Sequence, residues 1–345
     1  MIKKKKSQIL SAVFILLTAP FLSCSEKKTT PGFLTAKEVV LLNQLIYKEN
    51  IPEAFAKYAS GFETVFLPEA VNGNLAIIAK SKNSGRYAVV IRGSVLEFNE
   101  EGFQNFILHD FNVFTIKPWN YADTVDGAFI SNGSFAGFQN LLQLKDKQTG
   151  YGLKEFIEKK IPENATIIVT GHSLGGNLAY PLAGYLKKEL RTGNKENIQL
   201  ITFGAPAAGN AAFVQDMEKK FPAAERYVTD KDIAAVFPDI DQMSNMAKML
   251  GMEANLQLGK LSINGTGVNL DAGGLLNLAG DVLERTGVIK SDNKYVQSEK
   301  HLRLLTIKED LPPVSQAVAD SFFSRAYRFH RIDTYAGLLG GKTTE

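Results

Sequence analysis

The residues with the clearest chemical potential run from Gly171 to Gly176 and read Gly-His-Ser-Leu-Gly-Gly. They follow the β-branched run Thr166–Thr170 and precede a helix-forming segment that starts at Asn177. A Gly-x-Ser-x-Gly turn between a strand and a helix holds its serine on a strained bend, with the hydroxyl exposed and the next backbone N–H free. Glycines on either side let strand and helix approach where a Cβ would crowd them. The pattern predicts that Ser173 is the nucleophile of an acyl transfer.

The elements around this turn alternate between strand and helix, which favours a mostly parallel α/β sheet with helices on both faces. In such sheets the chemistry collects at the carboxyl ends of the strands. Ser173, the Arg92–Ser94 turn and the pair Asp230 and Asp232 all fall at such ends. The predicted strands are Asn74–Lys80, Arg86–Ile91, Thr166–Thr170, Asn197–Phe203 and Glu225–Thr229, and the predicted helices are Tyr151–Lys160, Asn177–Leu190 and Ala211–Lys220.

Several further motifs resemble those of one known family, the class 3 (fungal-type) lipases of the α/β-hydrolase fold. The strand Ala88–Ser94 is similar to that family's strand ending in Arg-Gly-Thr/Ser, and Asn105–Phe111 to its aromatic-x-x-Asp segment. Ala136–Phe138 resembles its Gly-Phe before a long helix, and Thr202–Pro206 resembles a recurrent block of the family. The resemblance covers roughly residues 60–240 and the C-terminal end. It implies an α/β-hydrolase fold and a serine hydrolase acting on esters.

A serine hydroxyl needs a base within hydrogen-bond reach, because it is a poor nucleophile at neutral pH. The fold that the resemblance implies carries its triad in the order Ser, Asp or Glu, His. Of the four histidines, only His301 and His330 follow Ser173. His330 and Tyr335 together resemble the family's C-terminal His-x-x-x-x-Tyr segment, whereas His301 fits a half-exposed strand position. We expect His330 to be the base, with His301 as the alternative.

The acid of the triad is expected at the end of the strand Glu225–Thr229, where two aspartates stand close together. Asp232 with Ile233 fits the register of the family's Asp-apolar segment, although Ala-Ala replaces the usual Val-Pro. Asp232 is therefore the predicted acid, and Asp230 remains an alternative that would otherwise be a solvated turn residue.

The developing oxyanion needs two preorganised N–H donors. The first is the backbone N–H of Leu174, directly after the nucleophile, and the resemblance assigns the second to Ser94. Ser94 could also be a plain turn residue. We expect no metal and no organic cofactor, because the histidines are too few and too scattered to form a metal cluster.

The N-terminus predicts export. Lys3–Lys6 precede the apolar run Ile9–Leu17, and small residues near position 23 complete the pattern of a signal peptide at residues 1–23. Cys24 follows at once and resembles the lipidated cysteine of a bacterial lipoprotein, although Phe21 and Leu22 depart from the usual signal. The alternative is a plain signal peptide with an incidental cysteine. With one cysteine, the chain cannot form an intramolecular disulfide.

Length and charge narrow the remaining organisation. A tether at residues 24–34 leads to one α/β domain at 35–345, which begins with a capping box from Thr35 to Glu38. Removing residues 1–23, with their four lysines and no acid, changes the formal charge from +3 to −1. A near-neutral domain gives no electrostatic argument for nucleic-acid binding. We expect a monomer.

Two regions bear on the substrate. Residues 95–138 are crowded with aromatic side chains and include, at about 95–104, the position of the lid in the lipases that the chain resembles. Such a mouth suits acyl chains, although most of these rings could equally be core. Asp232 and His330 are separated by a long insertion, residues 239–294, which is either a helical cap with a methionine-lined face or a packing insertion.

The sequence as a whole predicts an exported, membrane-anchored serine hydrolase of lipid esters, with Ser173, Asp232 and His330 as triad. It would sit in the cell envelope on the periplasmic or surface side, held to the membrane by lipidated Cys24. The alternatives are an aryl or cell-wall esterase of the same fold and a catalytically inactive lipid-binding lipoprotein.

Overall fold

The structure is a computed structural model that describes residues 32–94, 115–123, 125–250, 257–263, 266–271, 294–309, 319–341 and 344. The predicted signal peptide, Cys24, most of the tether and the expected lid at about 95–104 lie outside these residues.

A seven-stranded sheet forms the centre of the molecule, in the order β1-β2-β3-β6-β7-β9-β13. β3, β6, β7, β9 and β13 pair in parallel, whereas β1, β2 and β3 pair in antiparallel fashion at one edge. Every residue of β6 is buried, as expected for a central strand covered on both faces. The strands are β1 (Phe62–Phe66), β2 (Ala76–Ser81), β3 (Arg86–Ile91), β6 (Thr166–His172), β7 (Ile198–Phe203), β9 (Glu225–Thr229) and β13 (Leu302–Leu305).

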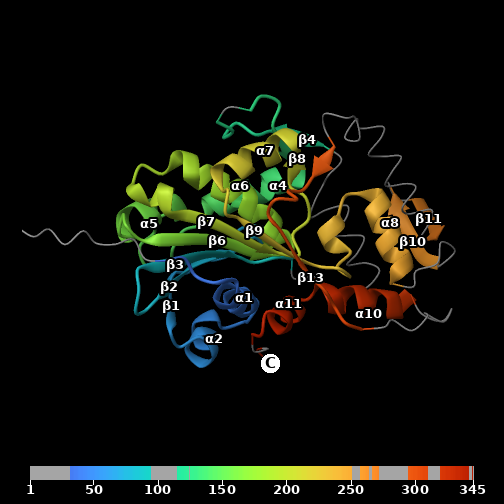
Figure 1. The fold of residues 1–345 in the computed structure, drawn as a ribbon, viewed down its shortest axis with the longest axis horizontal. Coiled ribbons are helices and arrows are strands. Elements are labelled where there is room, and N and C mark those ends of the chain that lie inside the picture. Colours follow the sequence, from blue (N-terminus) through green and yellow to red (C-terminus); the bar gives the residue numbers. More distant parts are fainter. Residues whose placement is uncertain are drawn as a thin grey trace, which may run out of the picture.

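Helices cover both faces of this sheet (Figure 1). On one face, the first hydrophobic cluster packs α4 (Asn132–Gln143), α5 (Leu153–Lys160), α6 (Leu174–Glu189) and α7 (Ala211–Lys220) against the strands. On the other face, a second cluster packs α1 (Ala36–Leu45), α2 (Ile51–Tyr58) and α11 (Ile332–Leu338). This layering is the α/β architecture that the alternating pattern predicts.

The two ends of the folded chain meet where α1 packs against α11. The Gln44 amide donates to the carboxylate of Asp333 at 2.7 Å, and the Lys48 ammonium donates to the Thr344 carbonyl at 2.6 Å. Tyr335 of α11 is fully buried in the same cluster as Val40 and Leu42 of α1. The capping box at Thr35 and Glu38 starts α1 as predicted.

The predicted elements agree closely with the structure between residues 76 and 229. β3, α7 and β9 have the expected bounds, and β2, α5 and β7 differ by one or two residues. α6 begins at Leu174, three residues earlier than predicted, because the chain turns directly from Ser173 into the helix.

The insertion between Asp232 and His330 differs from the purely helical cap considered above. α8 (Ile240–Met249) is helical, with Met243 and Leu250 buried, but β10 (Gln257–Ile263) and β11 (Thr266–Asp271) follow it as an antiparallel hairpin. Other elements around the sheet are β4 (Ile116–Pro118), β5 (Phe129–Ser131), β8 (Gly209–Asn210), β12 (Tyr295–Val296) and α10 (Ala319–His330), with the short 3-10 turns Gly193–Asn197 and Ala234–Val236.

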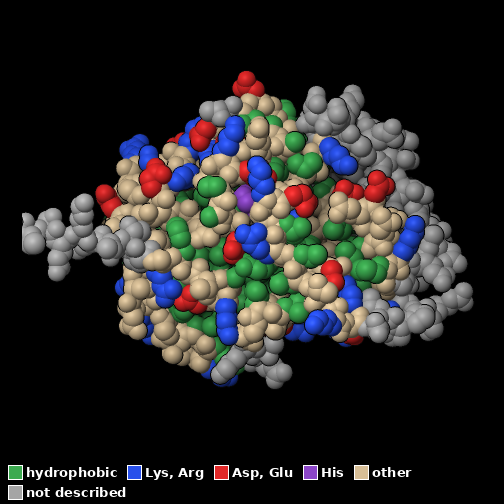
Figure 2. Space-filling view, viewed as in Figure 1, with side chains coloured by type: hydrophobic (Ala, Val, Ile, Leu, Met, Phe, Trp, Pro, Cys, Tyr) green, Lys and Arg blue, Asp and Glu red, His purple; other side chains and the backbone are tan. Residues whose placement is uncertain are grey.

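The surface and the aromatic residues bear on the sequence expectations. Positive and negative side chains are interspersed over the face drawn in Figure 2. Trp119 and Phe138 are buried in the first cluster, edge-on to one another, so these two rings are core. Phe98, Phe103, Phe106, Phe111 and Phe114 lie outside the described residues. Within the described ranges, no helix combines the length and the apolar character that a membrane span requires.

Candidate active site

Ser173 occupies the sharp turn between β6 and α6. Its backbone has φ 58° and ψ −129°, a conformation that costs a non-glycine residue about 1–3 kcal/mol. The Ser173 N–H donates to the Phe203 carbonyl of β7 at 3.0 Å, which holds the turn against the sheet. A Cβ on Gly175 would lie 2.9 Å from the Arg92 carbonyl carbon, and one on Gly176 would lie 2.8 Å from the Ala205 Cβ. The glycines after the serine are therefore required by close backbone packing.

The imidazole of His330 lies between Ser173 and Asp232. His330 is the last residue of α10, and its Nε2 is 2.7 Å from the Ser173 Oγ. Its Nδ1 is 2.9 and 3.0 Å from the two carboxylate oxygens of Asp232. All three side chains are buried, with exposed fractions of 5% for Ser173, 2% for His330 and none for Asp232. The structure thus brings together the serine, base and acid predicted from the sequence.

The Asp232 carboxylate receives three further hydrogen bonds. The backbone N–H groups of Ala234 and Ala235 donate to its Oδ1 at 2.9 and 3.3 Å. The Tyr335 hydroxyl donates to its Oδ2 at 2.5 Å. Burial, and then the Asp232 charge, hold the pKa of the Tyr335 phenol well above its ordinary value, so that it stays a donor. Donors converging on a buried carboxylate fix its orientation.

Tyr335 has a contact that the sequence analysis did not assign. The motif around His330 included this tyrosine only as part of a resemblance, with no role. Tyr335 lies five residues after His330, and the break between α10 and α11 at Arg331 allows its hydroxyl to reach Asp232. This spacing was the signal in the sequence that could have indicated the contact.

The two alternatives lie elsewhere. Asp230 is half-buried, and its Oδ1 accepts from the backbone N–H of Ile307 at 3.0 Å, so it orders the end of β13. His301 is buried just before β13, and its Nδ1 has no hydrogen-bond partner in the described structure. Burial is the main cause that lowers the pKa of His301, and the positive charges of Arg226, Arg303 and Lys300 lower it further, whereas Glu218 acts in the opposite direction.

The predicted oxyanion donors lie at the ends of adjacent strands. Leu174 is the first residue of α6, where a backbone N–H has no partner inside the helix and the helix dipole favours negative charge. Ser94 follows β3, which pairs with β6 up to Gly171. At the neighbouring Gly93, an added Cβ would be 3.2 Å from the Ser173 Cβ, so this strand end closely adjoins Ser173.

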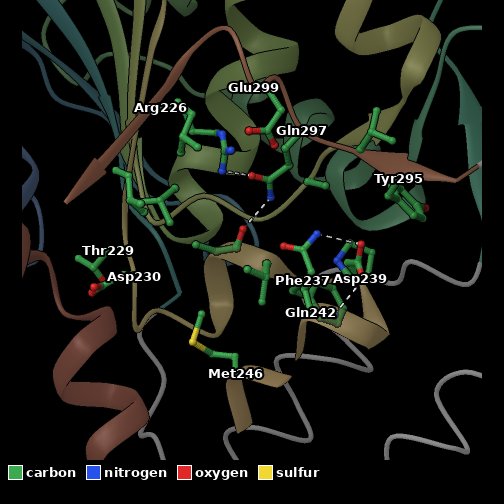
Figure 3. Close-up of a pocket in the computed structure, with 18 of the residues that line it drawn as sticks. Arg226, Thr229, Asp230, Phe237, Asp239, Gln242, Met246, Tyr295, Gln297 and Glu299 are labelled. Carbon is green, nitrogen blue, oxygen red and sulfur yellow. Dashed lines mark hydrogen bonds between the residues drawn. The ribbon is translucent and has the colours of Figure 1, made fainter. Parts of the chain in front are cut away.

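A cavity of about 630 Å³ opens beside the loop that follows β9, between the β9–β13 edge and α8 (Figure 3). Val228, Phe237, Met246 and Leu302 provide apolar walls, and Arg226 donates through Nη1 to Gln297 Oε1 on one side. Ser173 and His330 do not line it. Among the residues that the structure describes, no cluster of His, Cys, Asp and Glu is arranged to hold a metal.

Part of this chain is similar in sequence to known lipases. Residues 89–242 match the model of the family described as "Lipase (class 3)". A secreted mono- and diacylglycerol lipase of Malassezia restricta is 33% identical over 129 residues, which are 36% of this chain and 39% of that protein. The chloroplastic phospholipase A1-Igamma1 of Arabidopsis thaliana is 35% identical over 82 residues, which are 23% of this chain and 16% of that protein. The chain therefore spans less than half the length of either relative.

The fold has a match over nearly the whole chain. The crystal structure of M37 lipase aligns with a TM-score of 0.62 at 23% sequence identity, covering 89% of this chain and 94% of that one. The α/β-hydrolase fold expected from the sequence is thereby confirmed.

Proposed function

We propose that this chain, whose residues 89–242 match the class 3 lipase family model, is a serine hydrolase that cleaves carboxylic esters of lipids. One observation carries the proposal: the continuous line Ser173 Oγ, His330 Nε2, His330 Nδ1 and Asp232, with steps of 2.7 and 2.9 Å. A hydroxyl, an imidazole and a carboxylate in this line form the arrangement that activates a serine for attack on an acyl carbonyl.

Acylation uses the imidazole first as base and then as acid. His330 Nε2 accepts the Ser173 proton while Oγ bonds to the ester carbonyl carbon, and the carbonyl electron pair moves onto oxygen. Asp232 holds the other ring nitrogen as a donor and stabilises the imidazolium. As the tetrahedral intermediate collapses, the imidazolium gives its proton to the leaving alcohol, and the acyl group remains on Ser173.

The backbone N–H of Leu174 and a donor on Ser94 stabilise the negative charge of the intermediate by hydrogen bonds to the oxyanion. Leu174 begins α6 and Ser94 follows β3, and donors that are preorganised in this way stabilise charge as it develops. Water then attacks the acyl-enzyme, with His330 accepting its proton and returning it to Ser173 Oγ. The products are an alcohol and a carboxylic acid.

Lipid esters are the substrate class that the relatives support. By their names, one relative acts on mono- and diacylglycerols and another is a phospholipase A1, both of which break carboxylic esters of acylated glycerol. Export is part of the proposal, supported by the basic and apolar N-terminus and by the secreted relative. Membrane attachment through lipidated Cys24 rests on the sequence pattern alone.

A fluorophosphonate probe tests the nucleophile directly. We expect the wild-type chain to be labelled and Ser173→Ala to be unlabelled and inactive. Ser298→Ala is a matched control, because Ser298 is also buried, at 4% exposure, but donates to Glu218 instead of facing a base. Absence of labelling in the wild type would support the inactive-lipoprotein alternative. Turnover of aryl esters alone, with no hydrolysis of acylglycerols or phospholipids, would support the aryl esterase.

A further inference from the structure

His172, the residue before the nucleophile, is a buried histidine to which the proposed mechanism gives no step. Its side chain lies against the base, with the ring centroids of His172 and His330 4.7 Å apart and the planes inclined at 35°. The ring of Tyr47 meets it edge-on from α1's C-terminal side, at 6.0 Å between centroids. His172 is 6% exposed, so its nitrogens must find partners inside the protein.

Both ring nitrogens have partners, and these partners determine the tautomer. Nε2 is 2.7 Å from the backbone carbonyl oxygen of His330, which can only accept, so Nε2 carries the proton. In a neutral ring Nδ1 is then an acceptor, and it lies 3.0 Å from the Tyr47 hydroxyl. Burial raises the pKa of the Tyr47 phenol, which therefore remains protonated and donates to Nδ1.

The same hydroxyl accepts a hydrogen bond from the strand end next to Ser94. The Gly93 N–H donates to the Tyr47 oxygen at 3.1 Å. A directional chain results, from Gly93 N–H through Tyr47 and His172 to the His330 carbonyl. It joins the loop of the proposed oxyanion donor to the backbone of the proposed base.

His172 must stay neutral for this chain to persist. Burial first, and then the charge on His330, lower the pKa of His172 to about 3. Asp232 and Asp333 act in the opposite direction, and Tyr335 faces the ring at 6.1 Å between centroids. A second imidazolium would repel the one that forms on His330 during acylation.

We propose that His172 is a positioning residue, a neutral imidazole that fixes the His330 backbone and, through Tyr47, the Gly93–Ser94 loop. The inference rests on the proposed function for its catalytic meaning. Its physical basis is that the C-terminal carbonyl of a helix lacks an intrahelical partner, and here the missing donor is His172. The base and the oxyanion loop are thereby held in register with the turn that carries the nucleophile.

Two amide substitutions separate the two halves of the chain. The Gln side chain reaches the position of Nε2, so His172→Gln keeps a donor for the His330 carbonyl. The Asn side chain reaches only the position of Nδ1, so His172→Asn keeps an acceptor for the Tyr47 hydroxyl but loses the donor to the His330 carbonyl. Because small misplacements of catalytic groups can cost on the order of 100-fold, we expect His172→Asn to lower kcat by about 10- to 100-fold with little change in KM.

The conservative variant provides the decisive contrast. His172→Gln should retain most of the wild-type kcat, even if both variants lose similar thermal stability. Equal kcat values in the two variants, or activity losses that follow the melting temperature, would show a merely structural role and overturn the proposal.

Nitrogen-15 NMR of the full chain with labelled histidines tests the hydrogen-bond chain without any substrate. The signals of His172 are assigned by their absence in His172→Asn. We expect a neutral ring protonated on Nε2 that does not titrate between pH 5 and 8, where an ordinary histidine changes charge near 6.5. A ring that titrates in this range, or that carries its proton on Nδ1, refutes the inference. An expected spectrum from a chain that hydrolyses no ester would instead refute the proposed function while the hydrogen-bond chain stands.

Discussion

Replacing Asp232 by asparagine removes the negative charge next to the base while leaving the shape of the side chain unchanged. Oδ1 of the amide can still accept from Ala234 and Ala235, so the loop keeps its anchor. The new NH₂ group instead faces His330 Nδ1 and the Tyr335 hydroxyl. His330 must then present an unprotonated Nδ1 to the amide and a protonated Nε2 to Ser173, which reverses the direction needed for catalysis.

The magnitude follows from the charge and the distance. A unit charge about 4 Å from the centre of the imidazolium, at an effective dielectric constant of about 20, stabilises it by about 4 kcal/mol. At 1.36 kcal/mol per tenfold change in rate, this is about 10³-fold. The reversed tautomer adds to the loss, and the same substitution in a Ser-His-Asp protease lowers kcat about 10⁴-fold. We therefore expect a decrease in kcat between about 10³- and 10⁴-fold.

Steady-state hydrolysis of a chromogenic acyl ester measures this loss, and thermal unfolding checks that the variant is folded. Asp230→Asn is the matched control, because Asp230 lies two residues away and its carboxylate contacts the Ile307 N–H instead of the base. It should retain kcat within about threefold, because an asparagine at this position can still accept from the Ile307 N–H and its side chain does not contact His330. A decrease below tenfold in Asp232→Asn, or a larger loss in Asp230→Asn, would refute the assignment of the acid.

Two further predictions concern stability. The pKa of His172 is about 3 in the folded chain, against 6.5 in the unfolded chain. As the pH falls from 6.5 to about 3, the unfolded state binds a proton that the folded state does not, so the free energy of unfolding decreases over this range. By urea unfolding, His172 should lower the free energy of unfolding by about 2 kcal/mol between pH 7 and pH 5, and this decrease should be absent in His172→Asn. The same decrease in His172→Asn as in the wild type would contradict the prediction. Gly175→Ala should lower the free energy of unfolding by about 3 kcal/mol, because its Cβ would press on the β3 backbone, whereas Gly61→Ala, with no atom within 4 Å, should leave the urea midpoint nearly unchanged. Equal midpoints for the two glycine variants would show that the close approach at Gly175 is not needed.

The sequence was most informative where the local pattern decides the structure. The bounds of β3, α7 and β9 follow from their apolar residues and from the polar and turn-forming residues that flank them. The turn at Ser173 follows from its glycines. The pairing of Ser173 with His330 could be proposed because the expected triad order places the histidine after the serine, and only two histidines follow Ser173 in the sequence. Register favoured Asp232 over Asp230, but only the tertiary structure shows that Asp232 contacts His330 and that Asp230 contacts the Ile307 N–H.

Contacts across long sequence separations were not accessible in this way. Tyr47 and His172 are 125 residues apart, and nothing in the helix pattern of α1 points to the turn at the end of β6. The hairpin of β10 and β11 was missed for another reason. The helical spacing of methionine and leucine in residues 243–250 agrees with α8, but the sequence analysis considered only a helical cap or a packing insertion and predicted no strands after it.

The pairing of α1 with α11 has a consequence for how the molecule loses activity. His330 lies in a C-terminal unit that is held to α1 through Gln44 and Asp333, and to the central sheet through the buried Tyr335 and the hydrogen bond from His172. Proteins open in cooperative parts whose free energies lie below that of global unfolding. If the contact between α1 and α11 opens first, His330 moves away from Ser173 while the sheet and the turn at Ser173 persist. Inactivation and melting are then separate events, and the first helix, remote from the chemistry, governs the earlier one.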